Sequence, residues 1–363
     1  MAFMELDGDD PKSEACRLVL MRIGYLDADE QCQARIAWMY YNDGMTQADI
    51  AQYLGMTRAR VNRILQIVRE NGMVQVVIHS KLASCVALER QLEKTYQLER
   101  CVVVPTPRQE QRLLVALGGA AGQYLSGILR SKHTLCLGWG RTVDAAVGGL
   151  RGNGLENVRI ITLFGGLARD FTGNPTAIGA KAAAKVNAAE CWSIPAPMYV
   201  ESPELRDMLA RQEIFRSVFA KVGQAEIALV GAGDLTVRST NLLSGAVNES
   251  DWSSLLQAGA VGEVYGRFLN ESGQVVSHSM NNRFTGPNFS ALRRIRHVVL
   301  VAGGRQKIPI LRAALSKGYA HAFISDEETA SELTCSDALS ALPRAQRHGQ
   351  APKTPKIPEV SRA

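Results

Sequence analysis

The chain has 363 residues, which exceeds the usual length of one domain and favours two domains of unequal size. Its hydrophobic fraction of 46% and charged fraction of 21% are those of a globular protein with a sizeable core, and they exclude wholesale disorder. The formal net charge of +6 fits a solvated basic surface as well as a nucleic-acid partner. The distribution of the basic residues is therefore more informative than their number.

The sequence shows no sign of secretion or of membrane insertion. Residues 1–11 are acidic and lack a basic segment followed by an apolar one, and no apolar run elsewhere reaches the length of a membrane span. The seven cysteines are odd in number, scattered, and without a Cys-x-x-Cys pair. We therefore expect a cytoplasmic protein with reduced thiols, no membrane partner, no metal and no cofactor.

Three helices are predicted near the N-terminus. Apolar residues recur at helical spacing over residues 31–41, and this helix is expected to end near Gly44. Thr46 offers a side-chain oxygen to cap a second helix over 47–54, which Gly55 ends. The apolar stripe on the first helix consists of Ala34, Ala37, Trp38 and Tyr41, and it is widened by Ile36, Met39 and Tyr40.

A third helix is predicted from Thr57, its capping residue, to about Asn71. The short turn at Gly55 would hold this helix steeply across the second one, so that its N-terminal end can enter the major groove of DNA. The pattern indicates a helix-turn-helix domain. The alternative is a three-helix bundle with a solvated basic face.

Polar residues on the third helix and at the helix starts are candidates for contact with double-stranded DNA. Arginine can donate a forked pair of hydrogen bonds to guanine and asparagine can pair with adenine, while residues at helix starts suit phosphate contacts. The candidates are Gln47, Thr57, Arg58, Arg60, Asn62 and Arg63. A second basic run at residues 293–296 has no such context and is interpreted as a helix end or a subunit contact.

Beyond residue 100, short apolar runs alternate with helical segments, which predicts a parallel sheet with helices on both faces. Ligands bind such sheets outside the C-terminal ends of the strands, so the residues that follow each run are candidates for a binding site. The expected strands are residues 101–104, 134–138, 158–164, 227–231, 298–302 and 322–324.

The sequence GWGRT follows one predicted strand and precedes a helix. Two glycines allow backbone amides to approach an anion, the helix start adds a favourable dipole, and Arg141 and Thr142 supply side-chain donors. Val143 stands where a dinucleotide fingerprint needs a third glycine, and no Walker lysine follows. The candidate ligand-binding residues are Gly138, Trp139, Gly140, Arg141 and Thr142, with a merely tight strand-to-helix turn as the alternative.

Three charged residues near other strand ends extend this candidate site. Asp234 and Glu263 can accept hydrogen bonds from sugar hydroxyl groups, and Lys307 can meet a phosphate or another anion. Each of the three, taken singly, also fits the role of a turn or cap residue.

Residues 45–61, MTQADIAQYLGMTRARV, resemble the DNA-binding head of the SorC/DeoR-type sugar-responsive bacterial regulators. MVQVVIH at 73–79 resembles the strand or wing that closes that head, and 82–98 resembles the family's linker helix. GWGRT, NPTAIGAKAAA, PMYVESPELRDMLA, ALVGAGDL, AGAVGEVYGRF and VAGGRQK resemble, in this order, the SorC-type sugar-binding domain. That domain is itself similar to the ribose-5-phosphate isomerase and glucosamine-phosphate deaminase folds.

The resemblance implies a winged helix-turn-helix domain joined to a Rossmann-like α/β effector domain. The implied function is transcriptional regulation of a carbohydrate or polyol catabolic operon by a homodimer or homotetramer. A sugar, polyol or sugar phosphate would bind at GWGRT and the later strand ends and change operator affinity. The expected parts are an N-terminal extension (1–29), the helix-turn-helix domain (30–80), a linker helix (81–100), the effector domain (101–340) and a disordered tail (341–363).

Two other functions are considered. A sugar-phosphate isomerase or deaminase fused to a DNA-binding head would use Asp234, Glu263 and Lys307 in acid–base chemistry, which needs a base beside a carbon-bound proton. The second alternative is a DNA-binding assembly module whose α/β domain binds no ligand. The fused head favours a regulator that does not act as an enzyme.

Overall fold

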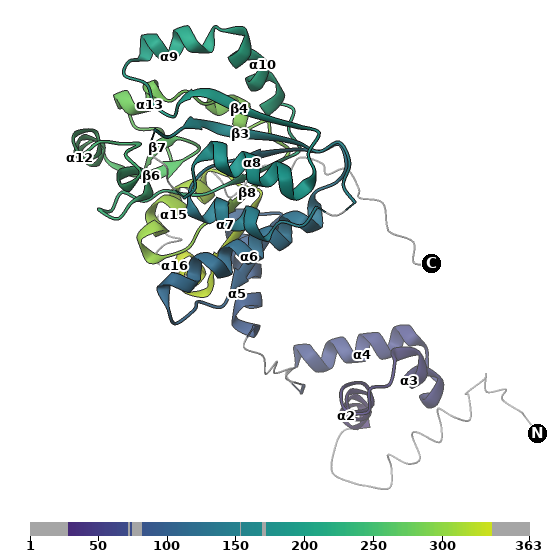
Figure 1. Ribbon diagram of the computed structural model, residues 1–363. Coiled ribbons are helices and arrows are strands. Elements are labelled where there is room, and N and C mark those ends of the chain that lie inside the picture. The colour runs from purple at the N-terminus through teal and green to yellow at the C-terminus, as the bar shows by residue number, and fades with distance from the viewer. Residues whose placement is uncertain (1–27, 72, 75–81, 153, 169–171, 336–363) are drawn as a thin grey trace, which may run out of the picture. The chain divides into compact units, whose positions relative to one another are not determined.

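The computed structural model describes residues 28–71, 73–74, 82–152, 154–168 and 172–335 (Figure 1). The chain divides into two compact units, residues 1–79 and 80–363. The predicted fold class is confirmed, because the first unit is helical and the second contains a parallel sheet covered by helices. No helix in these ranges is both long and apolar enough to cross a bilayer.

The first unit consists of α2 (Ala28–Tyr41), α3 (Gln47–Leu54) and α4 (Arg58–Glu70). Residues 75–79 of the expected wing, and Gly72 before it, lie outside the described residues. Side chains from all three helices meet in one small core that holds the head together. Its buried members are Ile36, Ile50, Ala51, Val61 and Leu65.

The wide apolar stripe predicted on the first helix is buried only in part in α2. The side chain of Trp38 is 63% exposed, and Ala34 and Tyr41 are also exposed, whereas Ile36 and Ala37 are buried. Helical spacing in α2 is compatible with two neighbouring faces because apolar residues surround most of the helix. Packing against α3 and α4 selects the face that contains Ile36.

The second unit is built on a seven-stranded sheet with the strand order β1-β9-β8-β5-β2-β3-β4, in which every neighbouring pair is parallel. All six predicted strands are present. The added edge strand β4 contains Pro195 and Pro197 and is largely exposed, so it lacks an apolar run. The strands are β1 (Arg100–Val104), β2 (Thr134–Leu137), β3 (Arg159–Gly166), β4 (Glu190–Pro197), β5 (Ile227–Val230), β8 (His297–Val301) and β9 (Ala322–Asp326).

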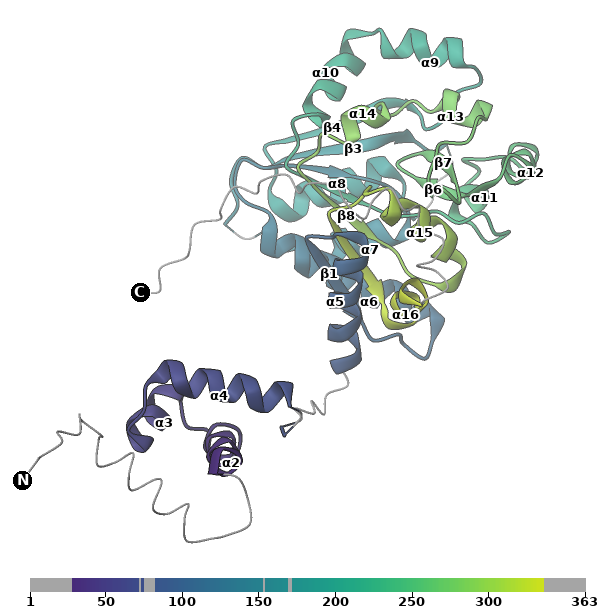
Figure 2. The same ribbon diagram turned by 180° about the vertical axis from the view of Figure 1, so that it is seen from behind.

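Alternating strand residues face two separate apolar cores. Leu135 of β2 packs into the core on one face and Cys136 into the core on the other. One face is covered by α6 (Glu110–Ile128), α7 (Arg141–Gly149) and α8 (Pro175–Val186). The other face is covered by α5 (Ala83–Tyr96), α10 (Glu213–Val222), α14 (Phe289–Leu292), α15 (Ile308–Ser316) and α16 (Glu327–Thr334), several of which are seen best from behind (Figure 2).

The helix expected to be a linker, α5, belongs to the α/β unit in the structure. Its buried residues Leu92 and Tyr96 pack into the same core as strand β1. The Tyr96 hydroxyl also donates a hydrogen bond of 3.1 Å to the Leu333 carbonyl of α16. These contacts fix α5 on the α/β unit.

A small satellite unit lies between β5 and β8 in the sequence. It contains a two-stranded antiparallel hairpin whose turn, Tyr265-Gly266, has φ values of 60° and 74°. Its separate core contains Leu255, Phe268 and Met280. The elements are α11 (Thr240–Leu243), α12 (Glu249–Gln257), β6 (Ala260–Val264), β7 (Arg267–Asn270) and α13 (Ser279–Arg283). Helix α9 (Pro203–Ala210) precedes α10 in the sequence and contacts α13 of this unit, where Nε of Arg206 donates to the Asn282 carbonyl at 3.1 Å.

Candidate functional sites for DNA and effector

The start of α3 in the N-terminal helical unit is fixed by a complete capping box. The Thr46 side chain accepts a hydrogen bond from the Asp49 amide, and the Asp49 carboxylate accepts one from the Thr46 amide, both at 3.2 Å. The Thr46 hydroxyl also donates to the Asp49 carboxylate at 2.6 Å. This bond and, after it, the one from the Thr46 amide lower the pKa of Asp49. Gly55 then ends α3 in a left-handed conformation at φ 65°, as the sequence predicted.

The second capping residue, Thr57, accepts a hydrogen bond of 3.3 Å from the Arg60 amide and starts α4. Val61, Leu65 and Val68 form the buried face of this helix. The five candidate DNA-contact residues Thr57, Arg58, Arg60, Asn62 and Arg63 are all exposed, and Gln47 is half-buried. Gln47 and Arg58 also border one open hollow beside the start of α3.

The effector candidates converge in the α/β unit on a pocket of about 980 Å³. The chain runs outward from β2 to β3 and β4, then returns to β5 on the other side of β2. The pocket opens where β2 and β5 end side by side, which is the topological switch point of the sheet. All eight sequence-selected residues line it: Gly138, Trp139, Gly140, Arg141, Thr142, Asp234, Glu263 and Lys307.

The amides of the two glycines in the GWGRT turn bond within the chain, so they are not the backbone amides open to an anion. The Gly138 amide donates to the Leu229 carbonyl at 2.7 Å, and the Gly140 amide donates to the Gly173 carbonyl at 2.9 Å. Helix α7 begins directly afterwards at Arg141, and the first N–H groups of a helix lack partners within the helix. Its start therefore remains the place where this turn can present amides to a ligand.

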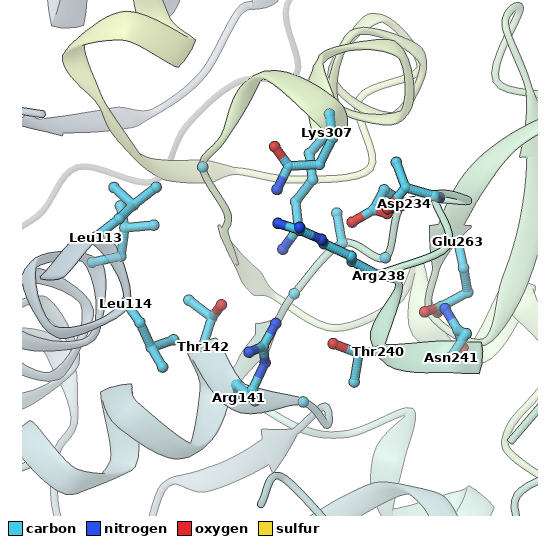
Figure 3. Close-up of a pocket in the computed structure, with 18 of the residues that line it drawn as sticks. Leu113, Leu114, Arg141, Thr142, Asp234, Arg238, Thr240, Asn241, Glu263 and Lys307 are labelled. Atoms are coloured by element: carbon cyan, nitrogen blue, oxygen red, sulfur yellow. Dashed lines mark hydrogen bonds between the residues drawn. The ribbon is translucent and has the colours of Figure 1, made fainter. Parts of the chain in front are cut away.

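Charged side chains of both signs surround the pocket. Arg141, Arg238 and Lys307 point into it, while Asp234 and Glu263 lie toward the satellite unit (Figure 3). Arginine and lysine suit the anionic end of a ligand, and carboxylates suit hydroxyl groups. The pocket can therefore hold a molecule that is anionic at one end and hydroxylated at the other, or a neutral polyol.

Glu263 is held rigidly at the deep end of the pocket. Its carboxylate accepts a hydrogen bond from the Gly266 amide across the hairpin turn. Burial raises the pKa of Glu263 to about 7, and the contacts with Gly266, Trp139 and Asn241 oppose that shift only in part. The carboxyl group therefore changes charge near neutral pH.

Lys307 and Asp234 complete this electrostatic environment. Burial lowers the pKa of Lys307, and the nearby Asp234 carboxylate counteracts the effect. Oδ1 of Asp234 accepts hydrogen bonds from the Thr236 amide at 3.0 Å and from the Thr236 hydroxyl at 2.6 Å. Asp234 is thus an oriented turn residue as well as part of the pocket wall.

Several lining residues were not singled out from the sequence. Arg238, Thr240 and Asn241 come from the segment that enters the satellite unit, and Leu113 and Leu114 come from α6. None of these positions directly follows a strand, so a search of the residues at strand ends does not identify them. Gln306 also lines the pocket. It lies in the VAGGRQK stretch that follows a predicted strand, so the search for strand ends does cover it.

A helix-turn-helix head joined to an α/β domain with a polar pocket at its switch point is the architecture of a ligand-responsive DNA-binding regulator. Residues 80–334 match the Sugar-bind family, described as a sugar-binding domain, and residues 19–90 match the Crp-like helix-turn-helix domain. The transcriptional regulator LsrR of Klebsiella pneumoniae subsp. pneumoniae is 35% identical over 311 residues, covering 84% of this chain and 92% of LsrR. The chain belongs to this family of sugar-binding transcriptional regulators.

Further relatives agree with this assignment. The erythritol catabolism regulatory protein EryD of Brucella abortus is 30% identical over 309 residues, covering 85% of this chain and 97% of EryD. The full-length sorbitol operon regulator SorC from Klebsiella pneumoniae has the same fold, with a TM-score of 0.67 at 24% identity over 85% of this chain and all of SorC. A DeoR family regulator from Listeria monocytogenes gives a TM-score of 0.63 at 25% identity over 68% of this chain and 98% of that protein.

Proposed function

We propose that this regulator controls a carbohydrate or polyol catabolic operon from the cytoplasm, and that a sugar, polyol or sugar phosphate changes its affinity for operator DNA. The observation that carries the proposal is the gathering of Arg141, Asp234, Glu263 and Lys307 at one switch-point pocket. The names of EryD and SorC, which refer to erythritol and sorbitol, support a polyol as the effector class.

In this proposal the pocket binds the effector and does not convert it into a product. The relatives are transcriptional regulators. Asp234 and Glu263 already accept hydrogen bonds from Thr236 and Gly266, which gives both carboxyl groups a role in shaping the pocket. An isomerase or deaminase would instead have to convert the compound that it binds.

Selection of genomic fragments by the purified full-length chain tests this function. The selected DNA should contain a two-fold symmetric site, and titration with erythritol, sorbitol and their terminal phosphates should change the affinity for it. Coupling between two sites is typically about 1 to 3 kcal/mol, which is a change of roughly 5- to 150-fold. Conversion of a bound compound into a new product would support the enzyme, and selection of no sequence would contradict the regulator.

A further inference from the structure

Asn241 stands at the deep end of the pocket, beside Glu263 (Figure 3). It lies in the short helix α11, which begins after the capping residue Ser239. Its side chain is fully buried, and its amide nitrogen packs closely against the backbone of Gly233. The residue is therefore part of the pocket wall and contributes an amide group to it.

The amide of Asn241 lacks a hydrogen-bond partner among the described residues. Both Nδ2 and Oδ1 are buried, and neither meets the geometry of a hydrogen bond. The Asn241 amide lowers the pKa of Glu263 as a hydrogen-bond donor to that carboxylate would, so its nitrogen lies beside Glu263. The contact nevertheless misses the geometry of a hydrogen bond, and the carboxylate accepts from the Gly266 amide instead. Buried polar groups in proteins are nearly always paired, so an amide with two unused atoms at a pocket wall calls for a partner from outside the chain.

Asn281, the other buried asparagine of the satellite unit, shows how a structural amide behaves. Its Oδ1 accepts from the Phe268 amide at 2.8 Å, and its Nδ2 donates to the carbonyls of Phe268 at 3.2 Å and Val276 at 2.8 Å. These bonds tie α13 to strand β7 and to the segment that follows it. Asn241 makes none of these internal bonds although it is buried to a greater degree.

We propose that Asn241 is a specificity-determining residue, whose amide binds two neighbouring hydroxyl groups of the effector beside Glu263. The inference rests on the proposed function, and it identifies a pair of hydroxyl groups as the part of the effector that this end of the pocket recognises. An asparagine amide offers donors and an acceptor side by side, and each hydroxyl group of a diol both donates and accepts. A diol therefore satisfies both unused atoms at once, which a single phosphate oxygen does not.

Access to this amide depends on the rim of the pocket. The amide atoms are shielded from bulk water. Entry of the hydroxyl groups therefore requires α11 to shift slightly outward. Helix α11 is only four residues long, and its Leu243 is exposed at the rim. The hydroxyl groups then fill the space next to Glu263 and complete the hydrogen bonds of the wall.

The test compares Asn241→Leu with Asn281→Leu in the full-length protein. Without ligand, Asn241→Leu should unfold at the temperature of the parent or above it, because it removes an amide that lacks partners. Asn281→Leu should lower the unfolding temperature by several degrees, because it removes three buried hydrogen bonds to the backbone. Equal losses of stability in the two variants would show that Asn241 is a structural residue and would overturn the inference.

The second readout is calorimetric binding of two matched pairs of probes. The first pair is erythritol and butane-1,2,4-triol, which lacks one internal hydroxyl group, and the second is sorbitol and 2-deoxysorbitol. The parent should bind the complete polyol at least about tenfold more tightly than its deoxy partner, and Asn241→Leu should bind both members equally and weakly. A structural residue would weaken both members alike and preserve their ratio.

The outcomes separate this inference from the function on which it rests. An Asn241→Leu variant that keeps the parent's preference for the complete polyol overturns the role of Asn241 and leaves the regulator intact. A parent protein that binds neither the four probes nor the terminal phosphates of erythritol and sorbitol contradicts the proposed effector class, and the role of Asn241 with it.

Discussion

The backbones of Gly233 and Glu263 are paired in both directions. The Gly233 amide donates to the Glu263 carbonyl at 2.9 Å, and the Glu263 amide donates to the Gly233 carbonyl at 2.8 Å. Gly233 lies just beyond strand β5, and Glu263 belongs to the satellite hairpin. This bridge fixes the buried carboxyl group of Glu263 at the end of the central sheet, and with it the deep wall of the pocket.

Glu263 should make stability depend on pH. The pKa of its carboxyl group is about 7 in the folded protein against an ordinary value of 4.5, so the folded state holds the proton more tightly. Stability from this group is complete below about pH 4.5 and is lost as the pH rises through 7. The expected loss is on the order of 3 kcal/mol.

The measurement is urea unfolding of the parent and Glu263→Gln between pH 5 and pH 8. The neutral amide cannot ionise, so the stability of the variant relative to the parent should rise across this interval. A difference between the two proteins that stays constant with pH would contradict the assignment of the titration to Glu263.

Gly173→Ala should destabilise the effector domain. Gly173 has φ of 104°, and an added Cβ would lie 2.5 Å from the carbonyl carbon of Gly140. We expect a loss of at least about 2 kcal/mol in the free energy of unfolding, together with weaker effector binding, because the GWGRT turn is displaced. Gly259→Ala is the control, since it has φ of 80° but open space around the new Cβ, and it should cost only about 1 kcal/mol.

Arg60→Ala and Asn62→Ala should each weaken specific operator binding by about 1 to 3 kcal/mol. Both side chains are exposed on α4, away from the core of the head, so folding should be retained. Fluorescence anisotropy with the selected operator at fixed salt measures the effect, and Gln66→Ala, exposed farther along α4, serves as control. Unchanged affinity in both variants would reject α4 as the helix that reads the bases.

The double variant Arg141→Ala with Lys307→Ala should lose the response to effector and keep ligand-free operator binding. Both residues line the pocket and neither belongs to the DNA-binding head. Arg305→Ala is a matched control, because Arg305 neighbours Lys307 in sequence but points to Glu328 at 3.8 Å. A double variant that responds as the parent does would move the effector site elsewhere, and one that loses operator binding would contradict the modular arrangement.

The smallest DNA-binding unit should be a homodimer, because a helix-turn-helix protein with two-fold symmetry reads two half-sites about one helical turn apart. Sedimentation of the full-length chain with and without operator DNA measures this. A single copy bound to a complete symmetric operator would contradict the prediction.

The sequence by itself determined the local features of both units. Thr46 and Thr57 predicted two helix starts because a capping oxygen acts within three residues, and Gly55 predicted the turn because the left-handed conformation favours glycine. Runs such as Val298–Ala302 predicted buried parallel strands because both faces of such a strand are apolar. The alternation of these runs with helices was enough to select the strand ends that line the pocket.

Only the tertiary structure decided the choices that depend on distant partners. Packing against α3 and α4 buried Ile36 and exposed Trp38, although helical spacing admitted either face. Contact with β1 made α5 part of the effector domain. The proposed role of Asn241 also depends on distant partners. Its amide is buried without a hydrogen-bond partner, in the wall of a pocket whose lining segments lie more than a hundred residues apart in the sequence. Spacing along a chain records which residues share a local face, whereas the pairing of a buried polar atom is settled only when the whole fold closes around it.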